Sequence, residues 1–193
     1  MPFKIAALVG SLRAESFNRR LAHALVRLPA AQEHDYLYPG IGDLPLYNQD
    51  DDTNQAPQVL RLRDEIRAAD GVLFVTPEYN RSVPGVLKNA IDHASRPFGE
   101  SAWKDKPAGV IGTSPSPVGT AAAQHHLRAI CHALGMPVMG QPEGYIQWNE
   151  DLVTDQGTIG EGSHDFLDGW MKAFLAHVAR HADEGWREPG AHL

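Results

Sequence analysis

Residues 76–92 read TPEYNRSVPGVLKNAID and continue the apolar run GVLFVT of 71–76. An unbroken apolar run of this length is typical of a strand that is buried on both faces. Downstream, apolar residues recur at helical spacing and predict a helix over 84–95. Pro84 is suited to the first helical position, and Ser82 to a cap just upstream. The polar residues between the two elements cannot help a core, so they form a strand-to-helix loop that needs another explanation.

The rest of the chain repeats this strand-then-helix pattern. Further apolar runs lie at 3–9 and 107–113, with weaker ones at 34–39 and 136–140. Helical spacing of apolar residues recurs over 16–28, 57–69, 119–135 and 163–182. Because a parallel neighbour is reached only by crossing a face of the sheet, this order predicts an α/β fold. The sheet would be doubly wound and five-stranded, with helices on both faces.

Such a sheet places its ligand site at one edge. Ligands bind beyond the carboxyl ends of the strands, where the winding direction reverses. The prediction brings together the loops 10–18, 76–84 and 113–120.

Length and composition fit one domain of this kind. The chain has 193 residues, and we expect a single domain over 1–182 followed by a mobile tail over 183–193. Its net charge of −7 lacks the broad positive field that nucleic-acid binding uses. The sequence contains no run of about 18 consecutive apolar residues, so no membrane span is predicted.

The titratable residues outside the loops predict no further chemistry. Cys131 is the sole cysteine, so it forms no internal disulfide, and we expect a buried, inert thiol in a reducing cytoplasm. The ten histidines show no metal-ligand spacing, and no metal is expected.

The first of the three loops, GSLRAESFN at 10–18, has the chemistry of a phosphate site. Ser16 suits the N-cap of the following helix, whose free N–H groups and dipole favour an anion. Ser11 and Asn18 add neutral donors, and Arg13 adds a charged fork. The loop has neither the three glycines of a dinucleotide fingerprint nor a P-loop lysine. The alternative is that Ser16 only caps the helix and Arg13 is solvated.

The loop of the opening stretch could hold a flat, polar ring. Tyr79 offers a face for stacking, while Asn80 and nearby backbone amides offer hydrogen bonds to a heterocycle. The alternative is an ordinary connector, stiffened by prolines, in which Glu78 and Arg81 are solvated.

At this point a family resemblance is visible. The sequence PEYNRSVPGVLKNAID (77–92) closely resembles the signature of the NADPH-dependent FMN reductases, a flavodoxin-like group that includes quinone, chromate and azo-dye reductases. GSLRAESFN (10–18), GDLPLYNQD (42–50) and GTSPSPVGTAAAQHHLRAI (112–130) resemble other loops of the group. The resemblance extends to about residue 145, and it implies a flavodoxin-like sheet with strand order 2-1-3-4-5.

The resemblance also implies which residues bind cofactor. The FMN phosphate would be held by Ser11, Arg13, Ser16 and Asn18, with Phe17 in the same set. The isoalloxazine would be lined by Pro77, Glu78, Tyr79, Asn80 and Ser82, and closed on its other side by Ser114, Pro115 and Gly119. Arg13 and Arg81 are candidates for contact with NADPH.

Two further regions are interpreted through the same resemblance. Ser116 and Thr120 stand where the resemblance leads us to expect glycines, which predicts a bulkier rim on the flavin site. Glu143, Tyr145 and Trp148 would help form a dimer or tetramer contact in the resembling family, or would simply lie in a covered loop.

The implied activity is that of an FMN-dependent NAD(P)H oxidoreductase. Hydride would pass from NADPH through flavin N5 to a small acceptor such as a quinone, chromate, an azo compound or free flavin. No side chain is then expected to be catalytic, and the chain would form a homodimer or homotetramer. One alternative is a flavodoxin-like FMN electron carrier that does not oxidise NADPH, and another is a nonflavin nucleotide-binding or regulatory domain.

Overall fold

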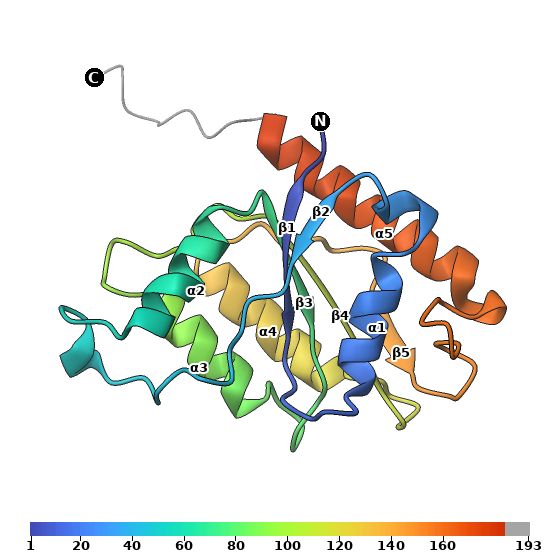
Figure 1. Ribbon diagram of the computed structural model, residues 1–193, viewed down its shortest axis with the longest axis horizontal. Coiled ribbons are helices and arrows are strands. Elements are labelled where there is room, and N and C mark those ends of the chain that lie inside the picture. Colours follow the sequence, from blue (N-terminus) through green and yellow to red (C-terminus); the bar gives the residue numbers. More distant parts are fainter. Residues whose placement is uncertain (184–193) are drawn as a thin grey trace.

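The computed structural model describes residues 1–183 and contains one five-stranded parallel sheet in the order β2-β1-β3-β4-β5 (Figure 1). The strands are β1 (Lys4–Val9), β2 (Asp35–Leu37), β3 (Gly71–Val75), β4 (Ala108–Ser114) and β5 (Gly144–Gln147). The helices are α1 (Phe17–Leu25), α2 (Pro57–Arg67), α3 (Gly85–Ala94), α4 (Ala121–Ala133) and α5 (Glu161–Asp183). Two short 3-10 turns, η1 (Pro29–Ala31) and η2 (Gln49–Asp51), lie between them. The predicted flavodoxin-like fold and strand order are confirmed.

The helices cover both faces of the sheet and make two cores. On one face, α1 and α5 pack on the sheet, and Trp170 and Phe174 of α5 are fully buried there (Figure 1). On the other face, α2, α3 and α4 pack around Phe74 and Trp103. Burying one large apolar side chain stabilises the fold by about 1.5–3 kcal/mol, so both faces contribute strongly. The continuous apolar runs reflect this double cover.

The strand register brings the predicted loops together. Val75 pairs with Val9 on one side and with Ile111 on the other, so β1, β3 and β4 reach the same edge. The loops that follow these three strands lie at that edge, at the bottom of Figure 1. The predicted location of the ligand site is therefore available in the fold.

The prediction of a fifth strand at 136–140 is wrong. That segment makes only an isolated bridge, between Val138 and Ala108 at the start of β4. The fifth strand is 144–147, which pairs with the far end of β4 from Ile111 to Ser114. Met136 and Met139 are buried although their segment forms no ladder, so hydrophobicity alone could not distinguish the two segments.

The predicted start of α3 also needs correction. The helix begins at Gly85, and Pro84 is its N-cap rather than its first residue. Ser82 does not cap it, because the Ser82 hydroxyl lies 3.0 Å from Nδ1 of His126 on α4. The serine therefore links the opening loop to a neighbouring helix.

Three remaining predictions concern the cysteine, membrane spans and the C-terminal tail. Cys131 is buried, as predicted, and burial raises the pKa of its thiol to about 12, which favours the protonated, less reactive form. Within residues 1–183, no helix combines the length and the apolar character that crossing a membrane requires. The tail expected over 183–193 lies outside the described residues, apart from Asp183 at the end of α5.

Gly112 of β4 provides a test of the packing at the site edge. A methyl group there would collide with the backbone oxygen of Thr76 and with the Thr120 hydroxyl. We expect Gly112→Ala to lower the free energy of unfolding by about 3 kcal/mol in urea denaturation. The matched control is Gly169→Ala in α5, where a methyl group meets nothing within 4 Å. It should raise stability by about 0.5–1 kcal/mol, and equal effects of the two changes would contradict this packing.

Candidate functional site

One pocket of about 190 Å³ gathers residues from all three loops at the carboxyl edge of the sheet. It lies between the start of α1, the segment that follows β3 and the end of β4. Its lining residues are Ser11, Arg13, Ser16, Phe17, Asn18, Pro77, Tyr79, Thr113 and Pro115. All of these except Thr113 belong to the predicted cofactor-binding set.

The start of α1 has the geometry of an anion site. Ser16 is the N-cap, as predicted, and its Oγ accepts a hydrogen bond from the Arg19 N–H at 3.2 Å. The N–H groups of Phe17 and Asn18 belong to the first turn and have no acceptor inside the helix. The Arg13 guanidinium lies 5.4 Å from the centre of the Phe17 ring, which holds its charge beside this turn.

The Asn18 side chain makes a structural contact that the sequence did not predict. Its side-chain Nδ2 donates to the Thr113 carbonyl oxygen, and its Oδ1 accepts from the Thr113 N–H, both at 2.9 Å. The side chain is buried, and its amide joins α1 to β4. Nδ2 uses one of its two N–H groups in this pairing, so the second N–H and the backbone N–H of Asn18 stay available to a phosphate.

The turn at 79–82 is a tight hairpin. Tyr79 and Ser82 exchange two backbone hydrogen bonds of 3.1 Å each. The two central residues, Asn80 and Arg81, have φ angles of 50° and 64°, in the left-handed region. This is the geometry of a type I′ turn, which costs free energy for a residue such as arginine. The turn holds Tyr79 at the pocket with 47% of its surface exposed.

The hairpin is fastened to α4. Glu78 is mostly buried, its Oε2 accepts from the Ala123 N–H at 3.2 Å, and its Oε1 lies 3.4 Å from the Arg81 guanidinium. A carboxylate at the start of α4 is favoured by the helix dipole. Glu78 and Ser82, which were predicted to line the isoalloxazine, thus direct their side chains to α4.

Internal hydrogen bonds hold the loop after β4. The Ser114 hydroxyl donates to the Gly119 carbonyl oxygen at 2.5 Å, and Gly119 has a φ of 63°. Thr120 is fully buried, and its Oγ1 accepts from Gln124 Nε2 at 2.9 Å. The prediction that Thr120 makes a bulkier rim is therefore wrong, whereas Ser116 is exposed.

Six predicted site residues do not line this pocket. They are Glu78, Asn80, Arg81, Ser82, Ser114 and Gly119. Glu78 precedes the hairpin, while Asn80, Arg81 and Ser82 belong to it. Ser114 is the last residue of β4, and Gly119 lies in the loop after that strand. Their roles toward a cofactor stay predictions.

Sequence reasoning missed Thr113 and did not resolve Trp148. Thr113 ends the buried part of β4, and its Oγ1 is buried without a hydrogen-bond partner among the described residues. Thr113 stands at the end of the apolar run 107–113, and this position could have indicated that it lies at the site. Trp148 is buried and stacks on Phe17 with 4.3 Å between ring centres, while Arg20 covers it at 4.8 Å. Trp148 thus lies in a covered loop that supports α1.

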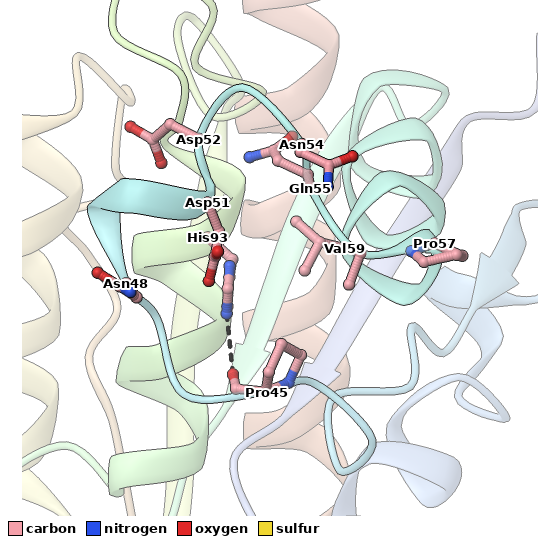
Figure 2. A pocket seen from close by; sticks show the side chains of 10 residues that line it. Pro45, Asn48, Asp51, Asp52, Asn54, Gln55, Pro57, Val59 and His93 are labelled. Carbon is pink, nitrogen blue, oxygen red and sulfur yellow. Dashed lines mark hydrogen bonds between the residues drawn. The ribbon is translucent and has the colours of Figure 1, made fainter.

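A larger hollow of about 420 Å³ lies elsewhere, between the 45–57 segment and α3 (Figure 2). His93 Nε2 lies 2.9 Å from the Pro45 carbonyl oxygen, as the dashed line in Figure 2 shows. Asn89 also fixes this segment, donating to Pro45 and accepting from the Tyr47 N–H, both at 2.8 Å. The hollow shares no lining residue with the smaller pocket, so size alone does not identify the site.

The Asn18 pairing gives a testable expectation. Asn18→Ala leaves a buried N–H and a buried C=O of Thr113 without partners, which should cost about 2–4 kcal/mol of unfolding free energy. The control is Asn54→Ala at an exposed position, which should change stability by less than about 0.5 kcal/mol. Urea denaturation measures both. An Asn18→Ala variant as stable as the control would contradict the pairing.

Known proteins resemble this chain over nearly its whole length. The family model described as NADPH-dependent FMN reductase matches residues 3–149. A 2-hydroxy-1,4-benzoquinone reductase from a Burkholderia species is 49% identical over 180 residues, covering 92% of this chain and 97% of the relative. A quinone reductase from Escherichia coli strain K12 is 41% identical over 183 residues, covering 92% and 96%.

A solved structure shows the same similarity. FerB, a flavoenzyme NAD(P)H:(acceptor) oxidoreductase from Paracoccus denitrificans, superposes with a TM-score of 0.89 at 44% identity. The match covers 93% of this chain and 98% of FerB. The fold, the matched region and the identity to these relatives agree: the chain belongs to the NADPH-dependent FMN reductase family, as the motif at 77–92 predicted.

Proposed function

We propose that this chain is an FMN-dependent NAD(P)H oxidoreductase that acts on quinone-type acceptors. The observation that carries this proposal is the meeting of the α1 start and the Tyr79 hairpin in one pocket. The names of the relatives support the choice of acceptor, since two of them are quinone reductases and FerB is an NAD(P)H:(acceptor) oxidoreductase.

The residues at the phosphate end of the pocket fit an FMN monophosphate. The start of α1 lines the pocket with Ser16, Phe17 and Asn18, and the positive end of the helix dipole favours a dianion there. Ser11 and Ser16 are buried and line the pocket with their hydroxyl groups nearby, and Arg13 adds a cation held over Phe17. This donor set is suited to a terminal phosphate.

The hairpin end of the pocket fits the ring system. Tyr79, Pro77 and Pro115 line the pocket, so the chain offers flat, apolar surfaces to a ring. None of the nine lining residues is a carboxylate, an imidazole or a thiol. When bound, the flavin supplies the hydride chemistry; the chain binds it, orients it and leaves a face open beside the exposed Tyr79.

We extend the proposal to the donor, assembly and location. Arg13 and Arg81 are exposed cations beside the pocket, which supports their contact with NADPH. The exposed side chains of Leu46 and Phe98, at 86% and 90%, support burial in a homodimer or homotetramer. The buried thiol of Cys131, which has no cysteine partner, supports a cytoplasmic location.

The activity can be tested on the purified protein. We expect heat to release one FMN per chain, and we expect the holoenzyme to oxidise NADPH continuously when benzoquinone is supplied. Comparison with NADH measures the donor preference. An FMN-containing protein that leaves NADPH unoxidised would instead be an electron carrier, and a protein that takes up no FMN would refute the proposal altogether.

Arg13 allows a sharper test of the phosphate end. We expect Arg13→Ala to weaken FMN binding roughly 10-fold to 100-fold, because a charged hydrogen bond contributes about 1.5–3 kcal/mol. Fluorescence titration of the apoprotein with FMN measures this. Arg67→Ala, on α2 across the sheet, removes the same charge and should change the dissociation constant less than about twofold. Equal FMN affinity in both variants would contradict the role of Arg13.

A further inference from the structure

Another hollow, of about 550 Å³, lies beside α1, and no residue of the five strands lines it. Its walls are the helix and the segment around 153–157. Ser16 lines both this hollow and the smaller pocket of the proposed flavin site, so the two adjoin at the start of α1. Nothing in the proposed function uses this hollow, and its lining therefore needs a separate explanation.

The lining is strongly basic in an acidic protein. Arg19, Arg20, His23 and Arg27 line the hollow, and Asp155 is the acidic residue among them. Within residues 1–183, none of the three arginines has a carboxylate oxygen within 4 Å. The whole chain carries a net charge of −7, so the positive charge of this lining is opposite in sign to the net charge of the protein.

Two of the arginines are held in place by neutral groups. Arg20 donates to the Val153 carbonyl oxygen at 3.0 Å, and Arg27 donates to the Gln156 carbonyl oxygen at 2.6 Å. Neither bond neutralises a guanidinium, and each leaves further N–H donors. The contacts therefore fix the orientation of two positive charges on one wall without compensating them.

Arg19 adds a third guanidinium to this lining, and His23 lies beside it. They are one helical turn apart on α1, and both also line a neighbouring pocket beside Tyr38. The His23 ring lies 4.5 Å from the Tyr38 ring. Burial, followed by the positive charges of Arg19 and Arg27, lowers the pKa of His23, so these charges repel a further cation. An anion in the hollow would relieve that repulsion.

We propose that the hollow between α1 and the 153–157 segment is a second anion site, which binds a phosphate ester or pyrophosphate group. Oriented guanidinium groups suit phosphate oxygens because they offer several charged donors in a fixed plane. The group has two possible sources. It is either the phosphate-bearing end of NADPH, a source that rests on the proposed function, or a separate phosphorylated small molecule.

The site is tested by calorimetric titration of the FMN-loaded protein with inorganic pyrophosphate at 0.15 M salt. With the flavin site filled, we expect one pyrophosphate per chain. Arg19→Gln should weaken binding about tenfold, because Arg19 has no hydrogen-bonded anchoring role among the described residues. Arg19→Lys should restore part of the affinity, since it keeps the charge. The matched control is Arg67→Gln on α2, which should change affinity less than about twofold.

The outcomes distinguish specific pyrophosphate binding at this hollow from an effect of the overall charge of the protein. No pyrophosphate binding at millimolar concentration would overturn the proposal, and so would equal losses in Arg19→Gln and Arg67→Gln. Urea denaturation of Arg19→Gln, showing an unchanged midpoint, excludes loss of folding as the cause. The titration contains no redox step, so this site can be found even if the proposed activity fails.

A kinetic comparison identifies the source of the phosphate. If the site holds the 2′-phosphate of NADPH, Arg19→Gln should raise KM for NADPH about tenfold and leave KM for NADH nearly unchanged. If it holds a separate molecule, pyrophosphate binding weakens while both KM values stay as they are. Each result supports the second anion site and assigns it a different occupant.

Discussion

The site depends on one buried side chain that satisfies two backbone groups at once. Asn18 pairs with both the N–H and the C=O of Thr113, and thereby holds the start of α1 against the end of β4. An amide is the side chain that can donate and accept in this way. Because both partners are buried, the contact fixes the position of the α1 start and of its free N–H groups. The phosphate end of the proposed FMN pocket depends on that position.

The hairpin at 79–82 is the second constraint. Two consecutive residues with left-handed φ angles cost free energy, and the surrounding contacts compensate for it. Glu78 accepts from the first turn of α4, and Ser82 contacts His126 on the same helix. The hairpin is thus held by α4, while Tyr79 stays exposed at the pocket. The left-handed turn and its contacts to α4 together fix the position of the Tyr79 ring.

The sequence was sufficient for the architecture and for the general location of the site. Unbroken apolar runs predicted the buried strands, and the motif at 77–92 predicted the loop that carries Tyr79. The same hydrophobicity misplaced the fifth strand, because residues 136–140 are buried without pairing in a ladder. The strand at 144–147 is short and contains Gly144, so it has little apolar signal of its own.

Individual roles at the site were harder to predict, for a physical reason. A motif indicates which residues lie near a ligand, but the direction of each side chain depends on distant partners. Asn18 turns to Thr113, 95 positions away in sequence, and Glu78 turns to Ala123. The hollow beside α1 likewise forms only because the 153–157 segment lies next to the helix, which no local pattern indicates.

The most direct test of the account is a crystal structure of the protein with FMN. The account predicts the phosphate within hydrogen-bond distance of the backbone N–H groups of Phe17 and Asn18, with the isoalloxazine against Tyr79 and Pro115. A structure that places FMN outside this pocket, or that leaves the α1 start without a phosphate, would contradict it.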